Sequence, residues 1–315
     1  SLDHVQVTAR KYFTTGDLDI VLVGKVSAFR DALKKQFAGA EITEIPFGEV
    51  DVLSPALRAS KHGAAAAAAP PATPESLEQG KQILLAGAQA AGGDALQSVA
   101  TLGFSESGTL HNPRADRHLG VTWQVSYPDR SYGEVDLGSA TIVQVCDGTS
   151  SWLKFPDGIH DTTNMIDEFK RGIMLFGGGW GIYQQALAGK ITGQAIGEEE
   201  IAGKKTLGVA VTGAFGAVKL YFDPTTHLLA AARYQSATDH GLSDNEQHWS
   251  DYRNVEGRQF AFATDTYRDG AKLFDSTVQA VQINPKLDDA LFAKPEAASP
   301  AAAPSPAPAP GSAPK

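Results

Sequence analysis

The feature that most constrains this chain is a repeated alternation of apolar and polar residues. Apolar side chains occupy every second position in residues 121–127, and the pattern recurs at 207–211, 218–222 and 228–234. A period of two places the apolar side chains of a strand on one face of a sheet. Turn signals such as Asp147-Gly148 separate these segments. The pattern predicts an antiparallel meander with one apolar face.

Helical patterns accompany the strands. A helix is expected to begin at Pro74 and Glu75 and to end near Gly92-Gly93. A second helix is expected over 165–176, followed by a break at Gly177-Gly178-Gly179 and a third helix over 180–187. A large curved sheet with helices on one face is an α+β solution. We therefore expect an open half-barrel whose concave face, covered by helices, can hold an apolar cavity.

Residues 1–58 show a different pattern, which indicates a partial α/β segment. We expect a helix over 3–13, a buried strand over 18–23, a helix over 26–37 and a strand over 41–45. So short a segment needs partner strands for stability. The chain begins at Ser1 within the expected helix, so we expect the natural N-terminus to lie upstream.

Two Ala/Pro-rich segments divide the chain. Residues 59–74 contain a run of alanines followed by prolines that stop a helix, which is typical of a linker. Residues 296–315 lack bulky apolar side chains and are expected to be a disordered tail. The segment between them, 75–295, is the expected β half-barrel domain.

Composition excludes several classes of function. A net charge of −9 gives no electrostatic basis for binding nucleic acid or anionic headgroups. The single cysteine, Cys146, rules out a disulfide within the chain and fits an inert core thiol. The sequence has neither an apolar run long enough for a membrane helix nor a recognisable signal peptide.

Catalytic motifs are absent from the sequence. None of the eight histidines pairs with another at metal-ligand spacing, and a chance arrangement explains His240 and His248 better than a metal site. The triple glycine lacks the spacing and lysine of a phosphate loop, so a helix break is preferred. The acidic run Glu198–Glu200 fits a solvated strand edge, and Asp288-Asp289 fits the start of a helical turn. We therefore expect neither catalytic nor metal-ligating residues.

Residues 9–37, ARKYFTTGDLDIVLVGKVSAFRDALKKQF, resemble the end of insulinase/pitrilysin-type zinc metallopeptidase domains. The resemblance covers about residues 1–58 and implies the C-terminal remnant of such a domain. The zinc motif of that family, H-x-x-E-H, does not occur in this sequence. The resemblance therefore implies zinc and proteolysis only for an upstream peptidase half, with no cofactor in this chain.

Residues 75–295 resemble lipoprotein-sorting proteins of the LolA/LolB type. Four phrases carry the resemblance in the right order, namely IVQVCDGTSSWLKFPDG, VKLYFDPTTHLL, WSDYRNVEGRQF and INPKLDDALFAKP. The third phrase departs from the family pattern, because Phe260 or Ala261 stands where a proline often follows. The resemblance implies a half-barrel that holds acyl chains, which is physically reasonable because each buried methylene contributes about 0.8 kcal/mol.

The alternation and helical spacing also predict which side chains face that cavity, although they could equally fill a dry core. The expected inward-facing strand residues are Trp123, Val125, Tyr127, Trp152, Leu220 and Phe222. The expected helix residues are Phe169, Ile173, Phe176, Trp180 and Tyr183.

Three functions remain open. The first is a non-catalytic C-terminal region of a bacterial cell-envelope or periplasmic insulinase-type peptidase, with its β domain binding a hydrophobic ligand or partner. The second is a periplasmic lipoprotein or lipid carrier without protease activity. The third is an interaction domain with a filled core. Cavity volume would separate the last two.

Overall fold

We describe the protein from a computed structural model, in which the chain divides into two compact units, Ser1–Ala59 and Ser60–Lys315. The structure describes residues 24–25, 30–36, 42, 44, 69–112, 115–238 and 241–294. In the first unit, helix α2 (Arg30–Gln36) lies inside the helix expected over 26–37. The helix expected over 3–13 and the strand over 18–23 fall outside the described residues, and only Ile42 and Glu44 of the strand over 41–45 are described. The expected α/β segment is therefore not shown.

The second unit is built on one sheet. Its strands are β1 (Thr101–Leu110), β2 (Arg117–Ser126), β3 (Arg130–Asp136), β4 (Thr141–Cys146), β5 (Ser151–Phe155), β6 (Gly158–Asp161), β7 (Gly193–Ile201), β8 (Lys204–Gly213), β9 (Gly216–Phe222), β10 (Leu229–Thr238), β11 (Gly241–Val255), β12 (Arg258–Arg268) and β13 (Ala271–Ile283).

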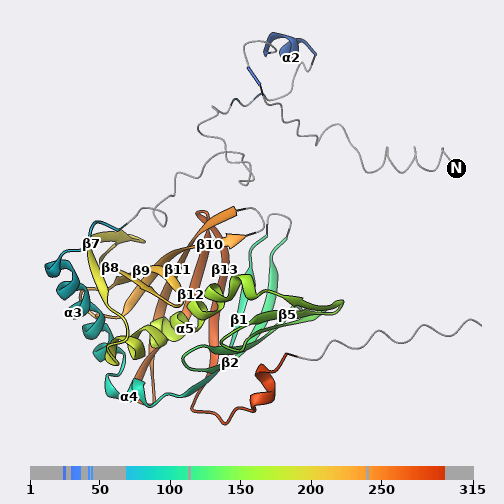
Figure 1. Cartoon of the computed structure of the whole chain (residues 1–315). Helices are drawn as coiled ribbons and strands as arrows, with labels where there is room; N and C mark the ends of the chain where they lie inside the picture. The colour runs from blue at the N-terminus through green and yellow to red at the C-terminus, as the bar shows by residue number, and fades with distance from the viewer. Residues whose placement is uncertain are drawn as a thin grey trace, which may run out of the picture. The chain divides into compact units, whose positions relative to one another are not determined.

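The 13 strands form an open antiparallel sheet in the order β6-β5-β4-β3-β2-β1-β13-β12-β11-β10-β9-β8-β7 (Figure 1). Hairpins join neighbouring strands in each half, and the pairing of β1 with β13 joins the two halves. The strands β6 and β7 are the two ends of this order, so the sheet does not close. The predicted open antiparallel sheet is confirmed.

The helices of this unit are α3 (Pro74–Ala91), α4 (Asp94–Gln97) and α5 (Ile166–Leu187), with short 3-10 turns η4 (Thr163–Met165) and η5 (Asp289–Phe292). In Figure 1, α5 runs across the sheet while α3 lies at the β7–β8 end. Residues 69–73 are not helical, and α3 begins where the prolines predict. Thr73 caps it by accepting from the backbone N–H of Ser76, and its last turn ends at Gly92, as expected.

The buried face of α3 is made of small residues and one leucine. Gly80 lies so close to β7 that a Cβ there would come 2.3 Å from the carbonyl oxygen of Gly193. Leu84 and Ala88 are buried as their spacing suggests, but Leu77 is 42% exposed. The helix turns its glycine side toward the sheet because only glycine permits this close approach of two backbones.

The break predicted in α5 is confirmed. Gly177, Gly178 and Gly179 all have positive φ, between 68° and 96°. A Cβ on Gly178 would also come 2.2 Å from the hydroxyl oxygen of Tyr252. Glycine is required here for both reasons, and the break divides α5 into two segments, residues 166–175 and residues 180–187.

The main core lies between the sheet and the helices, and a smaller core lies on the opposite face of β3–β5. Phe292 of η5 packs there against Val145 and Trp152. Asp288 caps η5 by accepting from the N–H of Ala290, as the Asp288-Asp289 pattern predicts. Residues 284–294 are thereby held against the sheet.

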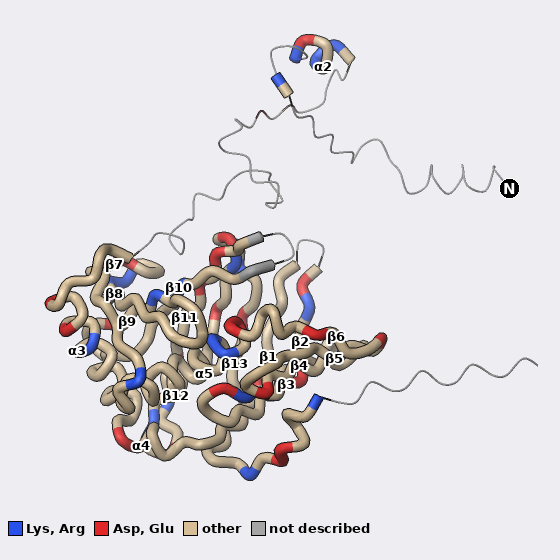
Figure 2. Tube along the Cα trace, viewed as in Figure 1, with Lys and Arg blue, Asp and Glu red and all other residues tan. Residues whose placement is uncertain are grey.

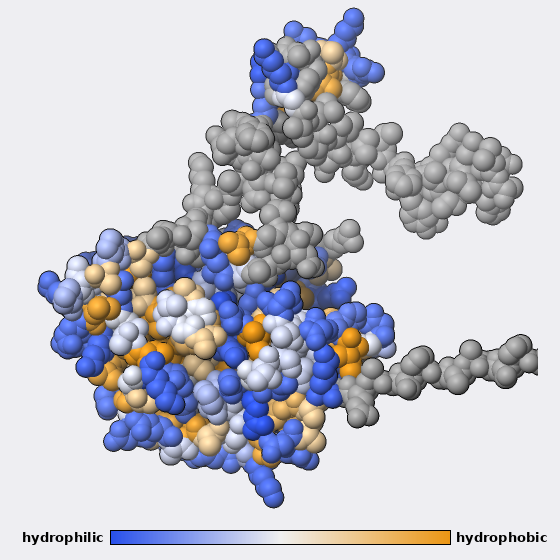
Figure 3. All heavy atoms as spheres, viewed as in Figure 1, coloured by the Kyte–Doolittle hydropathy of each residue, from blue (hydrophilic) through white to orange (hydrophobic). Residues whose placement is uncertain are grey.

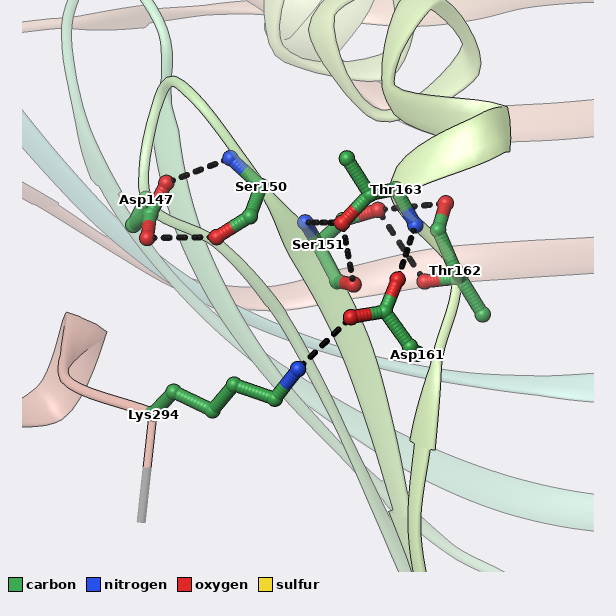
Figure 4. A network of polar contacts seen from close by, with 7 residues as sticks. All are labelled: Asp147, Ser150, Ser151, Asp161, Thr162, Thr163 and Lys294. Atoms are coloured by element: carbon green, nitrogen blue, oxygen red, sulfur yellow. Dashed lines mark hydrogen bonds and ion pairs between the residues drawn. The ribbon is translucent and has the colours of Figure 1, made fainter. Parts of the chain in front are cut away.

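A polar network fastens this terminal segment (Figure 4). The Lys294 ammonium donates to the Asp161 carboxylate at 2.6 Å. The pKa of Asp161 is lowered to about 2, mainly because of this hydrogen bond. Ser151 donates to the Thr162 carbonyl at 2.7 Å, which joins β5 to the turn before α5. The network therefore has a structural role, because it holds the terminal segment and the turn before α5 against β5 and β6.

The alternation predicted for 228–234 is interrupted in the structure. The pairing of β10 with β9 shifts register between Leu229 and Ala231, which is a β-bulge. Leu229 and Ala232 therefore both reach the main core, while Ala231 packs on the other face with Ile201 and Tyr221.

Charged and hydrophobic residues are mixed on the surface of the second unit. Figure 2 shows acidic and basic residues interspersed along the second unit. Figure 3 shows hydrophobic residues in small patches among hydrophilic ones on the displayed face. Among the described helices, none combines the length and the apolar character needed to cross a membrane.

Candidate functional site

A cavity of about 180 Å³ lies between residues 172–177 of α5 and the central strands β1, β2 and β11–β13. Six aromatic side chains line it, namely Phe104, Trp123, Phe176, Trp249, Phe260 and Phe274. Its polar side chains are Glu106, Gln247, Thr264 and Ser276. Glu106 is the only ionisable residue among the lining residues that the structure describes.

The register of the sheet brings these walls together. In β1, Leu102, Phe104 and Glu106 alternate with small residues and face the helices. Phe104 is directly opposite Trp123 of β2, and Trp123 is opposite Gly133 of β3. A Cβ on Gly133 would lie 2.5 Å from the indole ring, so the missing side chain leaves the space that Trp123 occupies.

The rings contact one another across the strands and the helix. The centroid of the Phe176 ring lies 4.8 Å from that of Trp123 and 5.1 Å from that of Phe104. Phe104 also lies 5.7 Å from Phe260, and Phe260 lies 5.1 Å from Trp180 in the main core. These separations are those of attractive aromatic pairs. The cavity wall is therefore continuous with the packed core.

Glu106 places a carboxyl group in this aromatic cavity. The indole N–H of Trp123 donates to its Oε1 at 3.0 Å, and the Ser276 hydroxyl donates to its Oε2 at 2.7 Å. Loss of water contact raises the pKa of Glu106, and the two hydrogen bonds offset that increase only in part. Within the described part of the chain, no Lys or Arg forms an ion pair with it.

Residues 166–175 form one side of the cavity. Gly172 and Leu175 line it from this segment, and Phe176 and Gly177 line it at the start of the break. A Cβ on Gly172 would have no neighbouring atom within 4 Å, so this position leaves space beside the cavity. Arg171, whose pKa is lowered by burial, holds the segment by donating to the carbonyls of Phe215 at 3.1 Å and Gln235 at 3.3 Å.

The structure brings two of the predicted cavity residues to this site, Trp123 and Phe176. Phe169 is partly buried on the same segment of α5. Six others lie in the main core with at most 1% of their surface exposed: Val125, Ile173, Trp180, Tyr183, Leu220 and Phe222. Trp180 contacts the wall residue Phe260. Whether any of the six contacts a ligand remains a prediction.

Trp152 lies elsewhere. It is opposite Val145, and both pack with Phe292 in the smaller core. The register from Trp123 through Gly133 and Gln144 places Val145 on the other face of the sheet. Trp152 therefore does not line the cavity, because side chains one position apart in a strand point to opposite faces.

Tyr127 lines a second, more open cavity of about 270 Å³, together with Gln97, Gln184 and Lys190. Its hydroxyl group is buried and has no hydrogen-bond partner within the described part of the chain. Burial raises the pKa of this tyrosine. This cavity has polar and apolar lining residues and lies beside α4 and the end of α5.

The residues that the sequence interpretation missed are Phe104, Glu106, Trp249, Phe260, Phe274 and Ser276. A signal for β1 was present, because Leu102, Phe104 and Glu106 alternate with Gly103 and Ser105. A glutamate in phase with apolar residues marks an inward-facing acid. The remaining residues become neighbours only through the pairing of distant strands.

Other sequence expectations can be placed as well. Cys146 is a buried free thiol whose pKa is raised by burial. His248 contacts Glu246, and no group of three or more metal-ligating side chains occurs among the described residues. Within the acidic run, Glu199 is not merely solvated, because it forms an ion pair with Arg233.

Comparison with known proteins finds solved structures that are similar to this chain, but no similar sequence family. No protein-family model matches the sequence, and no curated protein matches it. A LolA superfamily protein from Nitrosomonas europaea is similar at 13% identity and a TM-score of 0.48, over 68% of this chain and 97% of that one. A DUF1329 family protein from Desulfovibrio piger is similar at 11% identity and a TM-score of 0.46, over 69% and 97%.

A third solved structure, an outer membrane lipoprotein-sorting protein domain from Vibrio parahaemolyticus, is similar at 12% identity and a TM-score of 0.46, over 69% of this chain and 97% of that one. At these scores and identities, the three similar structures do not indicate a function for this chain. Nothing in the comparisons supports the insulinase-type peptidase expected from residues 1–58.

Proposed function

We propose that residues 75–294 form a non-catalytic binding module that takes a hydrophobic ligand into the cavity beneath residues 166–175. The observation that carries the proposal is the cavity itself, with six aromatic side chains around about 180 Å³ of space. Close-packed interiors leave few voids larger than a water molecule. A space of this size forfeits packing contacts in the free protein, and an apolar ligand that fills it would restore them.

The volume sets the size of the ligand. An apolar cavity of about 150 Å³ accepts a benzene-sized group, whereas pockets for larger ligands span about 300–1,000 Å³. The cavity as it stands holds one end of a ligand. A longer alkyl or acyl chain requires residues 166–175 to move away from the sheet, and the glycine break supplies the hinge.

This proposal favours the lipid or lipoprotein carrier over the peptidase remnant. A periplasmic or cell-envelope location belongs to the same proposal. Apolar burial provides the affinity for the chain of the ligand, because each methylene buried contributes about 0.8 kcal/mol.

The test is native mass spectrometry of the full chain with organic extraction, followed by titration with decanol. We expect a bound apolar molecule or uptake of decanol at one molecule per chain. Gly172→Leu places a side chain beside the cavity without a backbone clash and is expected to abolish uptake. The matched control is Leu77→Ala, which truncates an exposed side chain on α3. Absence of any bound molecule, or equal uptake by Gly172→Leu, would reduce the module to a scaffold.

A further inference from the structure

The carboxyl group of Glu106 is at odds with a purely apolar ligand. The aromatic cavity contains no cationic side chain among its described lining residues, yet it keeps an acid whose two oxygens each accept a hydrogen bond. Glu106 is partly buried. An acid placed in such a site without a counter-charge is unfavourable, and an apolar residue of similar volume would avoid that cost. The acid therefore points to a ligand group that interacts with it.

The surroundings of Glu106 define the chemistry of that group. The faces of aromatic rings attract cations, and a carboxylate beside them adds a negative charge in a site of low dielectric. A ligand carboxylate or phosphate would be repelled by Glu106. The oxygens of Glu106 also accept further hydrogen bonds from N–H donors, since each has a second lone pair.

We propose, resting on the proposed function, that the cavity recognises the positively charged nitrogen of an alkyl amine or alkylammonium ligand. Phe104, Trp123 and Phe176 surround the head of the ligand, and Glu106 provides its counter-charge. Trp123 orients Glu106 by donating to Oε1, and Ser276 orients it by donating to Oε2. The volume of about 180 Å³ matches a head group of benzene size, and the alkyl chain follows residues 166–175 outward.

The experiment compares three probes of equal chain length, decyltrimethylammonium, decanol and decanoate, by calorimetric titration of the full chain below their micellar concentrations. We expect the ammonium to bind at least about tenfold more tightly than decanol, and decanoate to bind most weakly. Glu106→Gln keeps the size of the side chain and its contact with Trp123. It is expected to lower the affinity for the ammonium about tenfold and to change that for decanol less than about twofold.

Glu198→Gln is the matched charge control, because Glu198 is 65% exposed on the edge strand β7. It should leave all three affinities unchanged. Equal binding of the three probes, or undiminished ammonium binding by Glu106→Gln with its thermal unfolding intact, would overturn the inference and leave the proposed function standing. Failure of all three probes to bind would overturn the proposed function and the inference with it.

Discussion

The two segments of α5 differ in side chains and in surroundings: residues 166–175 contain four charged residues, and residues 180–187 contain none. Residues 180–187 are embedded in the core: Trp180 and Tyr183 have at most 1% of their surface exposed, and the Trp180 indole donates to the Gln259 carbonyl at 2.8 Å. Residues 166–175 lie over a cavity: Arg171 and residues 173–175 are buried, whereas the other six residues are partly or fully exposed. The same helix therefore fills the core with one segment and borders the cavity with the other.

The hydrogen bonds differ in the same way. In the second segment, Gln184 donates to the carbonyls of Leu96 at 2.8 Å and Val99 at 2.7 Å, and the N–H of Leu229 donates to the hydroxyl oxygen of Tyr183 at 3.2 Å. The first segment has the Arg171 contacts near its middle. The proposed function requires the glycines between the segments to let the first segment move while the second stays in place.

The largest effect should come from truncating the fixed segment. We expect Trp180→Ala to lower the free energy of unfolding by about 3–5 kcal/mol, because it leaves a cavity in the main core. Phe176→Ala, next to an existing cavity and partly exposed, should cost only about 1–2 kcal/mol. Urea unfolding of both variants measures the difference. Equal losses of stability would mean that Trp180 in the main core and Phe176 at the cavity have equivalent surroundings.

The next effect concerns the break itself. Gly178→Ala should destabilise the protein by about 1–3 kcal/mol, because alanine is strained at positive φ and its Cβ would meet the Tyr252 hydroxyl. Thermal unfolding measures this loss. A neutral result would mean that the two segments can join as a continuous helix.

The third effect is a pH dependence of stability that belongs to Glu106. Because the pKa of Glu106 is raised above its ordinary value of 4.5, the folded state holds this proton more tightly than the unfolded state. The contribution of Glu106 to the free energy of unfolding is most favourable below pH 4.5. It is lost as the pH rises through the raised pKa. Glu106→Gln should therefore gain stability over the wild type with rising pH. Unfolding midpoints of both proteins from about pH 4 to pH 8 measure this gain. A constant difference would contradict the burial of Glu106.

The smallest effect is a gain. Gly172→Ala should stabilise the protein by about 0.5–1 kcal/mol, because alanine favours helix and the added Cβ meets no neighbour. The variant is the counterpart of Gly178→Ala within the same helix. A loss of stability would show that Gly172 lies closer to its neighbours than the structure indicates.

Much of the fold could be predicted from local pattern. The alternation predicted the strands, and the glycine run predicted the break in α5, because each pattern reflects conformation within a few residues. The bulge between Leu229 and Ala231 could not be predicted, because it depends on pairing with β9. The glycine face of α3 could not be predicted either, because Gly80 and Gly87 carry no apolar side chain that would mark a buried face.

The candidate site was less predictable. Trp123 and Phe176 could be chosen as aromatic residues in phase with a sheet or helix, but so could Trp152 and Trp180. The face that Trp152 occupies depends on the register of β2 to β5, and the burial of Trp180 depends on packing against Phe260. Glu106 was overlooked because β1 carries serines and glycines that weaken its apolar pattern.

The most direct test of the central claim is tryptophan quenching by undecanol that carries a terminal bromine. Two variants would be compared, each with a single tryptophan, Trp123 at the cavity or Trp152 on the opposite face of the sheet. We expect the ligand to quench the emission of Trp123 saturably and to leave that of Trp152 unchanged. Quenching of Trp152 alone, or of neither residue, would contradict a ligand site beneath residues 166–175.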